Sequence, residues 1–135
     1  MGRILLFTLL SFVSFNLSAQ TFITDENFES KISGRDKFSM EDQHSIVVVE
    51  FYADFNKDNA FKDWDKIKDV KYYRCNVADA PNAKKKYRVR TAPTIIIFVD
   101  GVKEETFKAG LDFLCPVELP ELKEAIQQAQ KSSQF

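Results

Sequence analysis

The chain has 135 residues, and its 19 lysines and arginines against 20 aspartates and glutamates give a formal net charge of −1. This balance leaves no global field that would favour nucleic acid or an anionic membrane, so partners must be recognised by local surface. The sequence holds one histidine and two cysteines, and no glycine-rich phosphate loop or serine-centred nucleophile motif. We therefore predict no metal site and no cofactor.

The first 19 residues are typical of a secretory signal. Arg3 supplies the positive start, residues 4–17 are an apolar run, and residues 18–19 offer a small-residue cleavage site. A run of this length is short for a membrane span, which needs about 20 apolar residues. We predict export, to a periplasm or to the medium, of a single domain over residues 20–135. The alternative is an uncleaved leader, residues 1–19, that anchors the chain in a membrane.

The first half of the mature chain predicts two helices on either side of a buried strand. Residues 24–33 predict a short helix that Thr24 caps and Gly34 ends. Residues 45–52 are a β-branched and aromatic run, typical of a central strand buried on both faces. Apolar residues at helical spacing predict a further helix over residues 59–68.

The second half predicts three strands and two helices. Asp100-Gly101, between two apolar runs, is a strong signal for a β-hairpin. Apolar residues four apart near the carboxyl end indicate an amphipathic helix. The predicted elements are a strand over 70–77, a basic helix over 79–87, strands over 94–99 and 102–108, and a helix over 119–131.

Several landmarks occur in the order in which thioredoxins have them. The chain from residue 20 onward therefore resembles the thioredoxin-like family. This resemblance implies an α/β fold with a central mixed β-sheet flanked by helices. The landmarks are a first helix start at 24–28, a strand that enters the active-site loop at 47–53, a family proline and its strand within 87–98, then Asp100-Gly101 and Gly110.

Within residues 51–59, which resemble the active-site segment, Asn56 and Asn59 stand where thioredoxins carry cysteines. A Cys-x-x-Cys pair works because one thiolate attacks a disulfide and the second thiol resolves the mixed disulfide. Asparagine can do neither. The substitution predicts a redox-inactive protein that is not an enzyme.

The resemblance also implies a groove, beside the family proline, that receives an extended segment of another protein. Recognition there uses main-chain groups and does not require cysteine. The leading hypothesis is therefore a protein-binding module, and the less family-like loop over residues 112–120 is a second candidate contact site. The predicted groove residues are Phe55, Asn56, Asn59, Ala92, Pro93, Gly110 and Leu111.

Two charged features complete the candidate sites. Glu50 and Arg74 stand where the family keeps a buried acid and a basic neighbour, which implies a buried ion pair. A basic patch near the groove could bind phosphate or an acidic partner, although a solvated helix face is the favoured interpretation. Binding of nucleic acid is disfavoured because the domain as a whole is not basic. The patch consists of Lys84, Lys85, Lys86, Arg88 and Arg90.

Cys75 and Cys115 are predicted to be separate thiols, with a structural disulfide as the alternative. Two further functions stay open at this point. One is a structural subunit of a larger assembly, such as an envelope complex or a virus particle. The other is a weak thiol-disulfide oxidoreductase that uses Cys75 or Cys115 alone.

Overall fold

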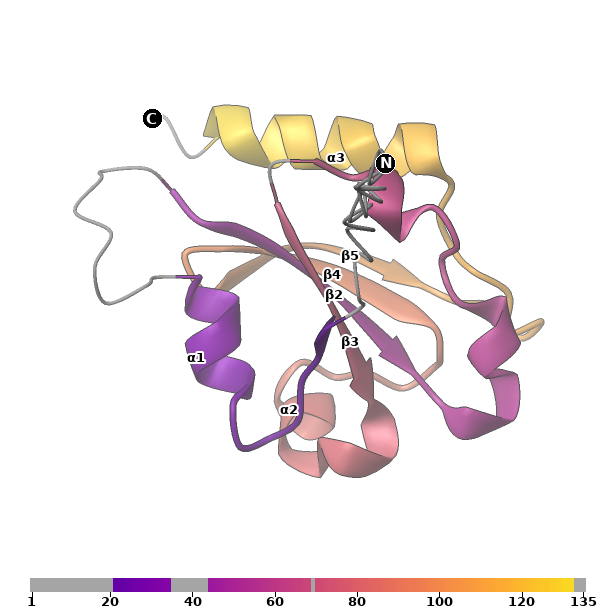
Figure 1. Ribbon diagram of the computed structural model, residues 1–135. Coiled ribbons are helices and arrows are strands. Elements are labelled where there is room, and N and C mark those ends of the chain that lie inside the picture. Colours follow the sequence, from indigo (N-terminus) through magenta and orange to yellow (C-terminus); the bar gives the residue numbers. More distant parts are fainter. Residues whose placement is uncertain (1–20, 35–43, 69, 133–135) are drawn as a thin grey trace, which may run out of the picture.

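The computed structural model describes residues 21–34, 44–68 and 70–132. Its centre is a five-stranded sheet in the order β1-β3-β2-β4-β5 (Figure 1). β1, β3 and β2 are parallel, whereas β4 and β5 are antiparallel to their neighbours, which confirms the predicted mixed sheet. The elements are β1 (Thr21–Phe22), α1 (Phe28–Ser33), β2 (Ile46–Tyr52), the 3-10 helices η1 (Asp54–Asn59) and η2 (Trp64–Lys66), β3 (Lys71–Asn76), the 3-10 helix η3 (Val77–Asp79), α2 (Pro81–Lys86), β4 (Thr94–Val99), β5 (Val102–Lys108) and α3 (Leu119–Ser132).

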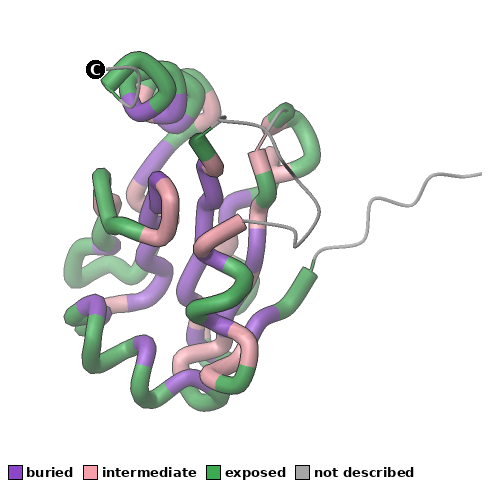
Figure 2. Tube along the Cα trace, turned by 90° about the vertical axis from the view of Figure 1, so that its left-hand side faces the viewer, coloured by how far each residue is buried: buried purple, intermediate pink, exposed green. Residues whose placement is uncertain are grey.

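The sheet divides the core into two layers because side chains alternate along each strand. Val47 and Val49 of β2 pack into a cluster that contains Phe28 of α1 and residues of α2. Val48 packs on the opposite face, in the cluster that contains Leu122 of α3. Figure 1 shows α3 on one side of the sheet and α1 on the other, and in Figure 2 the buried residues concentrate along the strands between them. The predicted burial of the central strand on both faces is confirmed.

The hairpin between β4 and β5 forms at the predicted place. Asp100 and Gly101 have φ values of 51° and 82°, the pair of positive values that a two-residue type I′ turn requires. The pairing slips by one residue between Ile97 and Phe98, so Glu104 of β5 is an extra residue in the ladder.

Helix α1 is shorter than predicted at its start. It begins at Phe28, so the N-cap position falls on Asn27 and not on Thr24, whose amide donates to Oδ1 of Asn27 at 2.8 Å. Its predicted end is confirmed. Gly34 has a φ of 61°, and a Cβ there would lie 1.6 Å from Oγ of Ser45, so only glycine fits.

The helix predicted over residues 59–68 is wrong. The short 3-10 helices η1 and η2 occupy this part of the chain, separated by extended backbone at Ala60. The backbone amide of Phe61 donates to Oε2 of Glu50 at 2.7 Å and is therefore not available to a helix ladder. A tertiary hydrogen bond thus outweighs the apolar periodicity.

The last helix is confirmed as α3, whose buried residues are Leu122, Ile126 and Ala129. The predicted basic helix is present as α2 but covers only Pro81–Lys86, after the 3-10 turn η3. The predicted signal, residues 1–19, lies outside the described residues. Among those that are described, no helix is both long enough and apolar enough to cross a membrane.

Candidate functional site

A buried carboxylate lies beneath the segment that resembles the thioredoxin active site. Glu50 is fully buried in β2, and three donors surround it: the Phe61 amide, the Tyr72 hydroxyl at 3.0 Å and Nε of Arg74 at 2.9 Å. Burial raises the pKa of this carboxyl above its ordinary value, although the three donors and the charge of Arg74 oppose the shift. The structure thus places Glu50 and Arg74 in direct contact, and the Arg74 guanidinium also lies 4.1 Å from the centre of the Tyr52 ring.

The two asparagines at the cysteine positions hold two loops together. Nδ2 of Asn56 donates to the Ala92 carbonyl at 2.6 Å, and Nδ2 of Asn59 donates to the Phe113 carbonyl at 2.8 Å. Asn56 also reaches the Phe113 carbonyl, at 3.5 Å, so the two amide groups converge on one oxygen atom. The asparagines therefore link η1 to the loop before Pro93 and to the loop after β5.

Exposed apolar side chains gather around these links. Phe113 has a φ of 56°, a value that residues other than glycine rarely adopt, and its ring packs edge-to-face on Phe55 with centroids 5.5 Å apart. Leu111 is 96% exposed and Phe55 73% exposed. We call this set the apolar rim; it consists of Phe55, Leu111, Phe113 and Leu114.

The structure brings most of the predicted groove together. Ala92 and Pro93 are buried and joined by a cis peptide bond, and the Pro93 carbonyl accepts from the Ala109 amide at 3.1 Å. Sequence reasoning treated residues 112–120 as a separate contact site. The structure divides that loop, because Phe113 and Leu114 join the apolar rim whereas Val117 is buried in the core.

A cleft of about 620 Å³ lies beside the rim. Asn59, Leu114, Cys115 and Pro120 are among its lining residues. Exposed apolar side chains and a recess therefore lie next to each other on this surface.

The two cysteines are free thiols, as predicted, and neither is set up as a nucleophile. Burial, with the charges of Asp25 and Asp79, raises the pKa of the Cys75 thiol to about 12. Burial also raises the pKa of Cys115. Both side chains are therefore thiols rather than thiolates near neutral pH, and the thiolate is the reactive form.

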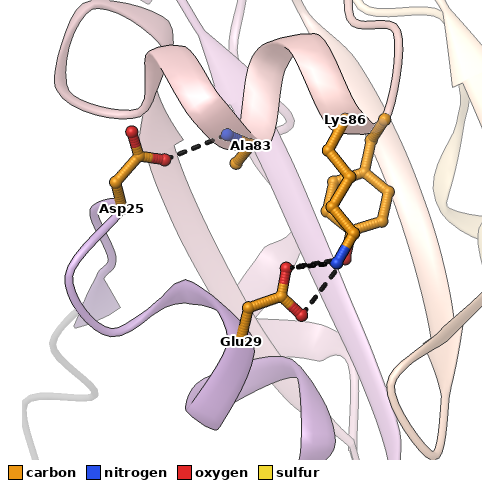
Figure 3. Close-up of polar contacts among 5 residues, drawn as sticks. Asp25, Glu29, Ala83 and Lys86 are labelled. Carbon is orange, nitrogen blue, oxygen red and sulfur yellow. Dashed lines mark hydrogen bonds and ion pairs between the residues drawn. The ribbon is translucent and has the colours of Figure 1, made fainter.

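Helix α2, which carries the lysines of the basic patch, is held to Asp25 and to Glu29 of α1 (Figure 3). The Asp25 carboxylate accepts from the amides of Asn82 and Ala83 at 2.9 and 3.0 Å, and so caps the helix from a distant segment. Glu29 of α1 accepts from Nζ of Lys86 at 2.7 Å. Lys86 is thus paired on the side facing α1.

Asp25→Ala should lower the free energy of unfolding by about 1 kcal/mol, the usual cost of losing a capping side chain. The measurement is urea denaturation at neutral pH. Glu26→Ala is the matched control, because Glu26 is an exposed neighbour, and should change stability by less than about 0.5 kcal/mol. Equal effects of the two substitutions would contradict the capping role.

Comparison with known proteins agrees with the resemblance of the sequence to thioredoxins and with the mixed sheet of the structure. The family model described as thioredoxin matches residues 19–113. The chain therefore belongs to the thioredoxin family. Among the residues described, it has no group of three or more histidine, cysteine or acidic side chains that could hold a metal ion.

Solved thioredoxins have the same fold. Thioredoxin f2 of Chlamydomonas reinhardtii is 17% identical, with a TM-score of 0.60 over 83% of this chain and 97% of that chain. A reduced thioredoxin of Schistosoma mansoni is 20% identical, with a TM-score of 0.61 over 82% of this chain and 98% of that one. Among curated proteins, thioredoxin M2 of Arabidopsis thaliana chloroplasts is 46% identical over 37 residues, which are 27% of this chain and 20% of that protein.

Proposed function

We propose that this thioredoxin-family protein does not exchange disulfides and instead binds an extended segment of another protein at the groove and its apolar rim. One observation carries the proposal: Asn56 and Asn59 stand at the cysteine positions and hydrogen-bond to Ala92 and Phe113. They keep the two walls of the groove in place while removing the reactive sulfurs.

Main-chain recognition requires a backbone group that can form a further hydrogen bond. A carbonyl oxygen has two lone pairs, so the bond from Asn56 leaves the Ala92 carbonyl one further acceptor position. An extended segment can pair with such main-chain groups, and its side chains would meet the apolar rim. Aromatic residues such as Phe55 and Phe113 are typical anchors of protein interfaces.

Contacts within the protein also restrain the residues of the apolar rim in the absence of a partner. The edge-to-face packing of Phe55 on Phe113 and the hydrogen bond of Asn59 restrain both loops. Groups that are already ordered lose less conformational entropy on binding. The rim is therefore suited to recognition more than to chemistry.

The alternative of a weak oxidoreductase is disfavoured by the raised pKa of both thiols. An insulin-reduction assay with Cys75→Ser and Cys115→Ser variants tests it. The structural-subunit alternative stays a prediction from the sequence. The predicted leader, residues 1–19, would place binding outside the cytoplasm.

A matched pair of variants tests the binding function. Full-length protein is used to capture partners from its own source, and the captured proteins are quantified by mass spectrometry. Phe55→Ser/Leu111→Ser should lose a stoichiometric partner, because it removes two exposed apolar anchors. Val102→Ser removes an apolar side chain that is 65% exposed on β5 and should retain the partner.

The thermal stability of both variants should stay close to that of the wild type, since none of the substituted side chains is buried and the exposed Phe55–Phe113 contact contributes only about 1 kcal/mol. Capture by the wild type and by both variants to the same extent would rule out the rim as the binding surface. Insulin reduction by the wild type would overturn the redox-inactive part of the proposal.

A further inference from the structure

Four cationic side chains line a second cleft, of about 460 Å³, at the end of α2. Lys84 and Lys85 come from the helix, and Arg88 and Arg90 from the segment that follows it. Pro81 and Val89 are its other lining residues. We call this site the basic cleft.

The end of α2 directs these side chains outward. The Val89 amide donates to the Lys84 carbonyl at 2.9 Å, and the Arg88 amide donates to the Lys85 carbonyl at 3.3 Å. These two bonds form a Schellman motif, which requires a left-handed residue after the helix. Tyr87 and Val89 are buried on either side of Arg88, so Arg88 and Arg90 are exposed.

Arginine is an unusual residue in this motif. Arg88 has a φ of 55°, a conformation for which glycine is the ordinary choice. The two backbone hydrogen bonds and the buried side chains of Tyr87 and Val89 hold Arg88 in this conformation. Glycine would form the same turn without supplying a charge to the cleft.

The acidic residues near α2 do not neutralise the cleft. Among the described residues, the carboxylates form no ion pair with Lys84, Lys85, Arg88 or Arg90. Asp25 caps the other end of the helix, and Glu29 is paired with Lys86 (Figure 3). Lys86, a member of the predicted patch, therefore does not contribute to the cleft.

We propose that the basic cleft binds an acidic protein segment rich in aspartate and glutamate. Arginine forms paired hydrogen bonds with carboxylates, and lysine supplies a point charge beside them. A net charge of −1 gives the whole protein no long-range attraction to nucleic acid or to an anionic membrane. The aromatic residue of the patch, Tyr87, is buried and offers no face on which a base could stack.

This inference goes beyond the proposed function, because it concerns a different surface and does not depend on the groove. Arg90 precedes Ala92 by two residues, so a short stretch of backbone joins the basic cleft to the groove. A partner with an acidic stretch beside an apolar extended segment could occupy both surfaces.

The test measures binding of a fluorescein-labelled peptide of six glutamates to the full-length protein by fluorescence anisotropy at low salt. Lys84→Gln/Arg88→Gln should weaken binding about five- to tenfold, since exposed charge pairs each contribute modestly. Lys85→Gln/Arg90→Gln should weaken binding to a similar extent. Because it leaves Arg88 in place, it excludes a change in the backbone turn at Arg88 as the cause. Lys86→Gln/Lys123→Gln changes the net charge by the same amount outside the cleft and should leave affinity within about twofold.

Failure of the peptide to bind the wild type, or equal weakening by all three double variants, would overturn the proposal. Tighter binding of a single-stranded oligonucleotide or of phosphatidylserine vesicles, lost in Lys84→Gln/Arg88→Gln, would also overturn it in favour of that partner. Leu111→Ser should bind the peptide with the same affinity as the wild type. The test of the basic cleft is therefore independent of whether the groove binds a partner.

Discussion

Asn56→Cys/Asn59→Cys should reduce insulin faster than the wild type does, with a rise over the dithiothreitol background on the order of tenfold or more. The two asparagine amides lie within 3.5 Å of the same Phe113 carbonyl, so side chains at these positions converge. Two cysteines there should form a disulfide and exchange it with a substrate. Turnover of insulin with dithiothreitol as reductant is the measurement.

Asn56→Ser/Asn59→Ser is the control, since it removes the same amides and adds no thiol, and it should stay at background. Thiol titration with and without reductant shows whether the new pair is oxidised. A disulfide that forms without any insulin reduction would mean that more than the two asparagines separates this protein from the redox-active family.

Arg74→Gln should lower the free energy of unfolding at pH 7 by about 3–5 kcal/mol, the usual penalty for leaving a buried charge without its partner. The Glu50 carboxylate is fully buried and would keep only the Phe61 amide and the Tyr72 hydroxyl. For a domain of this size the loss corresponds to roughly 10–20 °C in melting temperature. Lys71→Gln, on an exposed position of the same strand, is the control and should change stability by less than about 0.5 kcal/mol.

The penalty of Arg74→Gln should depend on pH in a defined direction. Burial holds the pKa of Glu50 above 4.5, and removal of Arg74 takes away an opposing charge and raises it further. A folded-state pKa that is raised makes the folded protein hold its proton, so stability is lost as pH rises from about 4.5 through that pKa. The difference between wild type and Arg74→Gln should therefore be small near pH 4 and largest at neutral pH. A difference that shrinks with rising pH would contradict this account.

Glu50→Gln should be the milder substitution of the pair. It removes the charge that burial opposes, and its amide oxygen can still accept from the Phe61 amide. If Glu50→Gln lowers the free energy of unfolding more than Arg74→Gln does, the charged form of Glu50 is stabilised by its surroundings, and this account is wrong.

The parts of the fold that local chemistry decides could be predicted from the sequence. The β4–β5 hairpin follows from Asp100-Gly101, and the end of α1 follows from Gly34, because both positions need positive φ. The continuous apolar run of β2 could be predicted because both of its faces are covered. The region after η1 could not, since the hydrogen bond between Phe61 and Glu50 joins residues 11 positions apart and has no local signature.

In the candidate site, too, features with a local sequence signal could be predicted, whereas features set by tertiary contacts could not. The resemblance at residues 51–59 predicted that asparagines stand at the cysteine positions, and the structure places Asn56 against the carbonyl of Ala92. It did not predict the contacts of Phe113 with Phe55 and Asn59, because a bulky residue with positive φ goes against its own preference. For the basic patch, sequence proximity placed Lys86 with its neighbours, whereas tertiary pairing with Glu29 removes it.

The extra residue at Glu104 has a consequence for how this protein behaves in concentrated solution. β5 is an edge strand, and unpaired edges invite strand-to-strand association between copies. The irregular ladder at Glu104 and the charged neighbours Lys103 and Glu105 interrupt the template that a second chain would need. At the opposite edge, β1 covers two residues within the described part of the chain. The protein can thus expose its apolar rim while its sheet resists polymerisation into stacked strands.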